Sequence, residues 1–151
     1  MDIKQASAED QPEIKQLIFS SLREYGLRPD SNTTDSDLDD IKSHYFDRGG
    51  YFGVIKENDI IVATVALYKV DETTCELRKM YISARQRGRG LGKRLLEFAL
   101  GKARNLGFKR MTLETATVLV EAIGLYKRYG FKEYKAPHLA TRCDQAFELW
   151  L

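Results

Sequence analysis

The sequence predicts a mixed α/β fold with a central, mostly antiparallel sheet flanked by about four helices. Three observations indicate this. Apolar residues recur at helical spacing in several stretches, three extended runs follow one another between residues 51 and 82, and a strand–helix–strand step spans residues 75–114. A chain of 151 residues has the length of one ordinary domain, so we expect residues 1–151 to form a single domain.

The N-terminal part is expected to begin with a short strand and continue with two helices. Residues 7–26 are predicted to form the first helix, because apolar side chains recur there at helical spacing and Gly26 is a suitable residue to end it. A reciprocal cap between Asp10 and Glu13 is predicted at its start. A shorter helix is predicted over residues 35–48, with aspartates near its positive N-terminal end.

Strands predominate in the rest of the chain. They are expected at Tyr51–Lys56, Ile60–Lys69, Cys75–Ile82, Lys109–Glu114, Phe131–Lys135 and Gln145–Leu151. Short connections favour antiparallel pairing of the first three strands. Helices are predicted from Leu91 to near Gly107 and from about Val118 to Tyr129. The first of these is a crossover, which requires that the strands on either side of it be parallel.

The net charge of +2 hides a strong partition along the chain. Residues 1–77 carry 8 Lys/Arg and 16 Asp/Glu, whereas residues 78–110 carry 11 Lys/Arg and 1 Asp/Glu. The remaining residues are balanced, with 5 of each kind. This pattern predicts an anion-binding centre beside an acidic lobe.

Several classes of protein are disfavoured. The longest apolar run, Ile60–Tyr68, is about half the ~20 residues that span a bilayer, so we expect no membrane helix. Residues 1–5 lack the pattern of a secretion signal, which favours a cytoplasmic location. Cys75 and Cys143 are expected to be free thiols. With only two histidines, neither a zinc site nor a Ser-His-Asp triad is expected.

A glycine-rich segment, Gly88-x-Gly90-x-Gly92, lies between a strand and a helix. Glycines allow a ligand close to the backbone, and the free N–H groups and dipole of a helix start favour phosphate. The neighbouring basic residues are Arg85, Arg87, Arg89, Lys93 and Arg94. The segment matches neither the Walker loop nor the full dinucleotide fingerprint. It is expected to bind a polyanion.

Three segments occur in order: Glu76-Leu77-Arg78-Lys79-Met80-Tyr81-Ile82, Arg87-x-x-Gly90-x-Gly92 and Leu125-Tyr126-x-x-Tyr129-Gly130-Phe131. Together they resemble the GNAT superfamily of acyl-CoA-dependent N-acyltransferases. The resemblance is strong over residues 75–134 and looser over the order of elements. It implies a GNAT fold, in which the strand before the glycine-rich loop splays from its parallel neighbour and the acyl-pantetheine arm enters between them.

The resemblance also implies acetyl-CoA as co-substrate and no metal. Its pantetheine arm would pair with the backbone of Met80, Tyr81 and Ile82. The pyrophosphate would lie on the N–H groups of Arg87, Gly88, Arg89, Gly90, Leu91, Gly92 and Lys93. One departure is Leu119, where many members have an asparagine that helps to hold the coenzyme, so binding here must depend more on the loop and strand.

Acyl transfer to an amine needs a proton acceptor, because an alkylamine has a pKa near ~10 and is mostly protonated at pH 7. Glu76 and Glu114 are the two candidate bases, and a water chain is a third option. Tyr126 matches the tyrosine that protonates the departing thiolate in many GNAT enzymes, whereas Tyr129 is expected to pack. The N–H of Ile82 is the expected oxyanion donor.

The expected acceptor is a small primary amine. Asp35, Asp37, Asp39 and Asp40 either suit a cationic amine or form a solvated helix face. His138 either borders the site or lies at the surface. An alternative within the enzyme class is acetylation of a protein lysine or N-terminus. A further alternative is a catalytically inactive acyl-CoA-binding sensor or partner-binding module, against which the presence of Tyr126 argues.

Two further expectations concern partners. Nucleic acid is disfavoured, because the arginines cluster at a helix start and lack interleaved aromatic residues for stacking on bases. GNAT domains often pair, so a homodimer is one expected assembly, although the sequence leaves the oligomeric state open.

Overall fold

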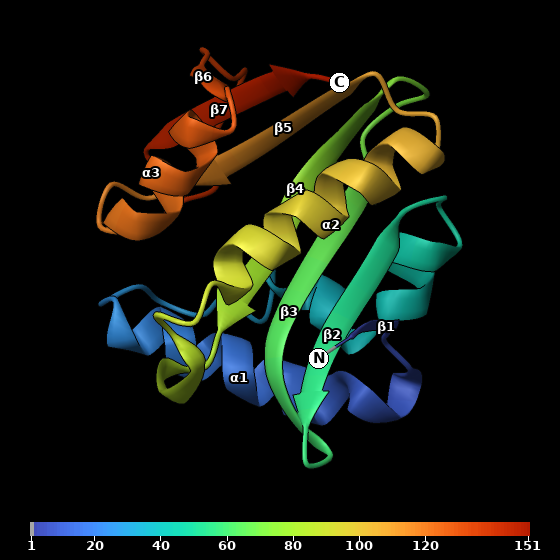
Figure 1. The fold of residues 1–151 in the computed structure, drawn as a ribbon, viewed down its shortest axis with the longest axis vertical. Coiled ribbons are helices and arrows are strands. Elements are labelled where there is room, and N and C mark those ends of the chain that lie inside the picture. Colours follow the sequence, from blue (N-terminus) through green and yellow to red (C-terminus); the bar gives the residue numbers. More distant parts are fainter. Residues whose placement is uncertain (1) are drawn as a thin grey trace.

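The computed structural model describes residues 2–151, and its seven strands form one sheet in the order β1-β2-β3-β4-β5-β7-β6 (Figure 1). The strands are β1 (Ile3–Gln5), β2 (Tyr51–Glu57), β3 (Ile60–Lys69), β4 (Thr74–Ile82), β5 (Arg110–Thr115), β6 (Lys132–Glu133) and β7 (Gln145–Trp150). The α-helices are α1 (Gln11–Glu24), α2 (Leu91–Asn105) and α3 (Val120–Arg128). Shorter helical turns are η1 (Ala8–Asp10), η2 (Ser36–Asp39), η3 (Lys42–Phe46) and η4 (Ala84–Gln86).

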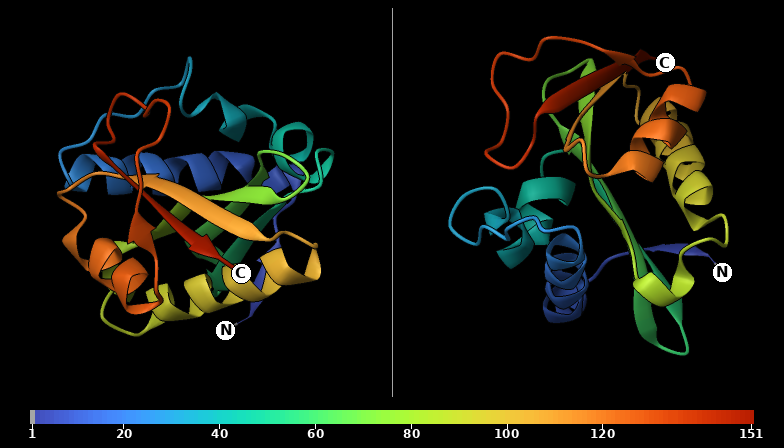
Figure 2. Two further views of the ribbon diagram at one scale, coloured as in Figure 1. Left: turned by 90° about the horizontal axis from the view of Figure 1, so that it is seen from above. Right: turned by 90° about the vertical axis from the view of Figure 1, so that its left-hand side faces the viewer.

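Helices cover both faces of the sheet, with α1, η2 and η3 on one side and α2 and α3 on the other (Figure 2). Each face has its own apolar cluster. Ile14 and Ile18 of α1 are fully buried on the first face, and Leu95 and Leu96 of α2 are fully buried on the second. The central strands are therefore apolar on both sides, which explains the long hydrophobic runs of β2 and β3.

The predicted mixed, mostly antiparallel sheet is confirmed, and so is its splayed parallel pair. β4 and β5 pair at only three positions, Thr74 with Arg110, Cys75 with Met111, and Glu76 with Thr112. Beyond these, β4 continues beside β3, while β5 continues beside β7 (Figure 1). Within residues 2–151, one edge of β4 is consequently left without a neighbouring strand over residues 77–82.

A β-bulge interrupts β4 within this unpaired stretch. Thr64 pairs with Tyr81 and Ala66 pairs with Arg78, so two residues of β4 stand opposite the single residue between them on β3. The first of the two, Lys79, adopts a left-handed φ of 52°, and its carbonyl accepts a 2.7 Å hydrogen bond from the Thr64 hydroxyl.

The bulge shifts the alternation of side chains along β4. Before it, Leu77 packs in the cluster beneath α2 while Arg78 faces the other side, over Tyr68. After it, Tyr81 packs in the cluster beneath α1. Side chains normally alternate between the two faces of a sheet, but the extra residue in the bulge breaks this alternation. Arg78 and Lys79 therefore lie on the same face although they are consecutive.

Two local predictions are wrong. Residues 35–48 form the separate turns η2 and η3 in place of one α-helix, because the chain leaves helical geometry at Asp40 (φ −154°, ψ 77°). The cap between Asp10 and Glu13 is absent. Asp10 instead accepts the N–H of Ser7 (2.9 Å), and Glu13 accepts the N–H of Ile61 on β3 (2.6 Å), which ties α1 to the sheet.

Candidate active site

Two cavities lie along the unpaired stretch of β4. The loop cavity, of about 280 Å³, is bordered by β4, the segment of residues 86–93 and α3. The carboxylate cavity, of about 320 Å³, is bordered by β4, β5 and residues 138–143, and Glu76 and Glu114 line it. Met80, Tyr81 and Leu119 line both cavities, so a ligand extended along β4 can reach from one into the other.

Most of the predicted coenzyme residues border the loop cavity. These are Met80, Tyr81, Ile82, Arg87, Gly88, Gly90, Leu91, Gly92 and Lys93. Arg89 is the exception, because its guanidinium donates to Gln86 (2.8 Å) and lies 3.9 Å from Glu57. The side chain of Arg87 is also engaged, donating to Glu24 (2.8 Å) and to the carbonyl of Ile82 (3.2 Å).

The backbone of the glycine-rich segment remains suited to an anion. Gly90 has a left-handed φ of 78° and immediately precedes α2, whose first N–H groups have no acceptor within the helix. A Cβ built at Gly90 would meet no atom within 4 Å, so the space above this residue is open. The helix start can therefore approach a phosphate closely through its backbone.

β4 also presents backbone groups to the same space. The N–H of Ser83 donates to Val62 on β3 (2.8 Å), so Ser83 faces β3. Lateral backbone directions alternate along a strand, so the N–H of Ile82 points away from β3, toward the side from which β5 has diverged. An extended ligand can pair with β4 from this side.

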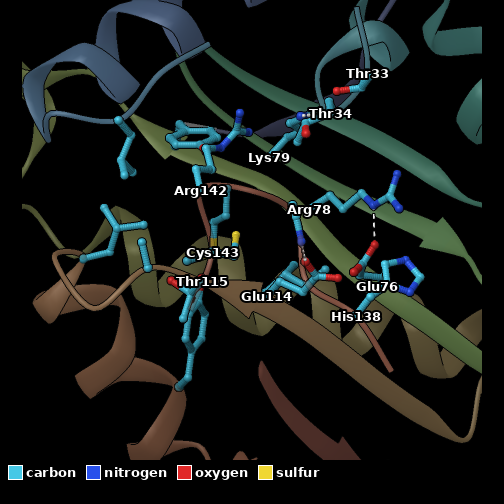
Figure 3. A pocket seen from close by; sticks show the side chains of 18 residues that line it. Thr33, Thr34, Glu76, Arg78, Lys79, Glu114, Thr115, His138, Arg142 and Cys143 are labelled. Atoms are coloured by element: carbon cyan, nitrogen blue, oxygen red, sulfur yellow. Dashed lines mark hydrogen bonds and ion pairs between the residues drawn. The ribbon is translucent and has the colours of Figure 1, made fainter. Parts of the chain in front are cut away.

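The two candidate bases come together in the carboxylate cavity (Figure 3). Glu76 accepts a hydrogen bond from Nε of Arg78, and Glu114 accepts one from the N–H of Ala140 (2.7 Å). Burial raises the pKa of Glu76 above its ordinary value of 4.5. The positive charge of Arg78 opposes this rise in pKa, and the nearby carboxylate of Glu114 adds to it. Such a carboxylate is a stronger base than one in water.

Tyr126 reaches the same cavity from α3 and is 7% exposed. Its ring packs against Phe131, with 5.8 Å between ring centroids. Burial, followed by the nearby Tyr81 hydroxyl, raises the pKa of Tyr126 well above 10, so the phenol keeps its proton at neutral pH. Tyr129, one turn further on, instead donates its hydroxyl to Glu97 (3.0 Å).

Sequence reasoning missed several polar side chains that line the carboxylate cavity, namely Thr33, Thr34, Arg78, Lys79, Thr115, Arg142 and Cys143. Arg78 and Lys79 lie inside the recognised motif, but only the bulge directs both of them to this face. No sequence signal marks Arg142. His138 is exposed and also lines the carboxylate cavity, so it both lies at the surface and borders the site.

A buried aspartate neutralises two of these cations. Nζ of Lys79 lies 2.5 Å from Oδ1 of Asp35, and Arg142 donates to both carboxylate oxygens of Asp35 at 2.8 Å each. The Asp35 side chain is 0% exposed. Burial opposes its ionisation, but the Arg142 hydrogen bonds and the Lys79 charge outweigh it and lower the pKa of Asp35 to about 2.

This network corrects both expectations for Asp35 and Asp37, whereas Asp39 and Asp40 are exposed. Asp35 and Asp37 are buried, so they neither form a solvated face nor meet an acceptor directly. Asp37 accepts from the Tyr45 hydroxyl and lies 3.5 Å from Lys79. The aspartates that follow Asp37 reach the surface, and Asp39 pairs there with Lys15 (2.6 Å).

Within residues 2–151, no group of three or more His, Cys, Asp or Glu side chains is arranged to hold a metal ion. Over the same residues, every helix is too short or too polar to cross a bilayer. Cys75 and Cys143 are free thiols.

A splayed parallel pair beside a glycine-rich helix start defines an acyl-coenzyme A-dependent N-acyltransferase fold. The chain belongs to the acetyltransferase (GNAT) family, whose family model matches residues 14–131. The predicted resemblance is thereby confirmed, and the protein is an acetyl-CoA-dependent acyltransferase.

Individual relatives agree with this family. The chain is 36% identical over 135 residues to "uncharacterized N-acetyltransferase YjgM" of Escherichia coli (strain K12), covering 86% of this chain and 81% of that protein. It is 31% identical over 104 residues to human N-acetyltransferase 8B, covering 65% of this chain but only 46% of that protein.

Solved structures share the fold. A GNAT acetyltransferase of Staphylococcus aureus Mu50 superposes with a TM-score of 0.90 at 22% identity, covering 97% of this chain and 96% of that one. The protein yncA of Salmonella typhimurium, solved with its cofactor acetyl-CoA, superposes with a TM-score of 0.77 at 18% identity, covering 99% and 92%.

Asp35→Asn should destabilise the fold strongly, because Arg142 loses its buried counter-charge and Lys79 keeps only the more distant Asp37, at 3.5 Å. We expect a loss of about 3–5 kcal/mol in the free energy of unfolding at pH 7, measured by urea titration. The control Asp39→Asn removes a surface pair with Lys15, whose aspartate is 56% exposed, and should cost less than about 1 kcal/mol. Similar losses in the two variants would contradict a special role for Asp35.

The same carboxylate should contribute to acid denaturation. The pKa of Asp35 is lowered from 3.8 to about 2 on folding, so its contribution to stability is complete above pH 3.8. That contribution should disappear as the pH falls through about 2. Between these values, the free energy of unfolding should depend less steeply on pH in Asp35→Asn than in the wild type.

Proposed function

We propose that the enzyme transfers the acetyl group of acetyl-CoA to the primary amine of a small molecule, by direct attack while both substrates are bound. The observation that carries this proposal is the junction of the two cavities at Met80, Tyr81 and Leu119. A thioester bound along β4 would end where Tyr126 and the two carboxylates begin. The size of the carboxylate cavity, about 320 Å³, favours a small acceptor.

Binding of the coenzyme is assigned to backbone groups. The pyrophosphate would be held by the N–H groups at the start of α2, where Gly88 and Gly90 keep the approach open. The pantetheine arm would pair with the outward-facing backbone of Met80, which leaves the N–H of Ile82 for the oxyanion. Because Leu119 places an apolar side chain at the junction, no side-chain amide from this position contributes.

The chemistry needs one base and one acid. Glu76 would accept the proton of the ammonium group, directly or through water, and Glu114 would keep the pKa of Glu76 raised. The neutral amine then forms a bond to the carbonyl carbon, with the N–H of Ile82 donating to the developing oxyanion. As the carbon–sulfur bond breaks, Tyr126 would donate its proton to the sulfur. The nitrogen still carries a second proton after forming the new bond, and it would pass this proton through solvent to the Tyr126 phenolate, while Glu76 gives up its proton to bulk water.

The cysteines support direct attack over a route through an acyl-cysteine. Cys143 lines the carboxylate cavity, but burial, followed by the nearby Glu114, raises the pKa of its thiol to about 11. Burial likewise raises the pKa of Cys75 to about 12. At neutral pH both sulfurs are protonated and poorly nucleophilic.

The function can be tested by measuring thiol release from acetyl-CoA with amines, amino acids, polyamines, aminoglycosides and peptides as acceptors. We expect release with at least one class of small amine, together with the acetylated product by mass spectrometry. Acetylation of peptides alone would favour a protein acceptor. Tight binding of acetyl-CoA without release from any acceptor would indicate a sensor.

Gly90→Val should abolish measurable binding of acetyl-CoA, because its side chain would fill the open space above the start of α2. Gly107→Val is a matched control. Gly107 also has a positive φ (91°) and an open Cβ position, but it follows the far end of α2. Binding is read by isothermal titration calorimetry, and equal affinities in the two variants would exclude the glycine-rich segment as the coenzyme site.

Tyr126→Phe should lower kcat by about 100-fold or more without changing the affinity for acetyl-CoA, because the proton donor is lost while the packed ring remains. Tyr129→Phe removes the same atom one turn away, where it contacts Glu97, and should leave kcat unchanged. Steady-state rates and coenzyme titration check both variants. Wild-type turnover in Tyr126→Phe would remove this residue from the acid role.

A further inference from the structure

Three cations line the carboxylate cavity, and they differ in their availability to a ligand. Lys79 and Arg142 are bound to Asp35, and their side chains are only 5% and 13% exposed. The side chain of Arg78 is 34% exposed. An acceptor entering this cavity therefore meets the positive charge of Arg78 most directly.

Arg78 is held in a defined position. Its guanidinium donates through Nε to Glu76, and its central carbon lies 3.8 Å from the centroid of the Tyr68 ring. Figure 3 shows the guanidinium beside the Glu76 carboxylate, with His138 on the far side of that carboxylate. Burial disfavours the charge on Arg78, but the Glu76 charge outweighs it and raises the pKa of the guanidinium, which stays protonated.

An ion pair in direct contact presents a negative and a positive group side by side to the cavity. An α-amino acid has the matching arrangement, because its ammonium and carboxylate groups are bonded to the same carbon. With the ammonium at Glu76, the carboxylate would fall beside the guanidinium, which binds carboxylates through paired N–H donors. A polyamine would place additional positive charge next to Arg78, and a simple amine would bring no group that binds the guanidinium.

We propose that the acceptor is an α-amino acid whose ammonium group binds Glu76 and whose carboxylate binds Arg78. This inference rests on the proposed function and adds the substrate class to it. The reaction is unchanged: the ammonium loses one proton to Glu76, the nitrogen loses its second proton as it becomes acetylated, and the carboxylate serves only for binding.

The test compares thiol release with matched acceptors that differ only at the carboxylate, such as L-phenylalanine, L-phenylalaninamide and phenethylamine, and the equivalent methionine series. In the wild type, kcat/KM should be about 10- to 100-fold higher for the acids, mainly through KM. In Arg78→Met this ratio should fall to near one. Arg78→Lys, which keeps the charge but loses the paired donors, should give an intermediate ratio.

Arg48→Met is the matched control. Arg48 also stacks on Tyr68, at 4.7 Å, but it does not line the carboxylate cavity, so the preference for acids should persist. If wild-type enzyme acetylates amides and amines as well as acids, the amino-acid assignment is overturned and the proposed function stands. If acetyl-CoA binds but no amine of any class is acetylated, the proposed function itself fails. A ratio unchanged in Arg78→Met would show that Arg78 only positions Glu76.

Discussion

The candidate active site depends on one buried carboxylate. Asp35 joins the segment between α1 and η2 to the bulge of β4 through Lys79, and to the segment before β7 through Arg142. All three segments contribute walls or neighbours to the carboxylate cavity. A buried pair of this kind gains little over an apolar core, but loss of one partner is costly, because it leaves charges that water cannot reach. The ion pairs of Asp35 with Lys79 and Arg142 thus fix the relative positions of the segments that border the carboxylate cavity.

β4 serves both cavities because of two departures from regular sheet geometry. Its loss of pairing with β5 frees backbone groups, and its bulge changes which side chains face α1. The N–H of Ile82 is consequently available along one edge, while Glu76, Arg78 and Lys79 share one face. A regular strand with two neighbours would have used its edges for hydrogen bonds and sent Arg78 and Lys79 to opposite faces.

The charge partition along the chain has a different meaning in the folded protein. The basic block is divided between the two cavities: Arg87 and Lys93 line the loop cavity, whereas Arg78 and Lys79 line the carboxylate cavity. Arg87 and Arg89 are engaged by Glu24, Gln86 and Glu57. The backbone and the helix start are left as the principal contacts for a phosphate. The acidic block is partly consumed within the fold, since Asp35 and Asp37 neutralise cations from distant segments. The distribution of charge along the chain therefore indicates the region of the site without identifying the groups that meet the substrate.

The sequence by itself determined the features that depend on near neighbours. Apolar spacing set the extents of α1, α2 and the central strands, and glycines at Gly88 and Gly90 set the helix start, because these follow from local backbone preferences. The crossover also required β4 and β5 to be parallel. Only the tertiary structure decided that Glu76 lies beside Glu114 and that Arg142 binds Asp35. It also decided that Arg78 is the most exposed of the three cations that line the carboxylate cavity. Those contacts join residues far apart in the chain, and they depend on where two strands diverge and on one extra residue in a strand, neither of which local spacing encodes.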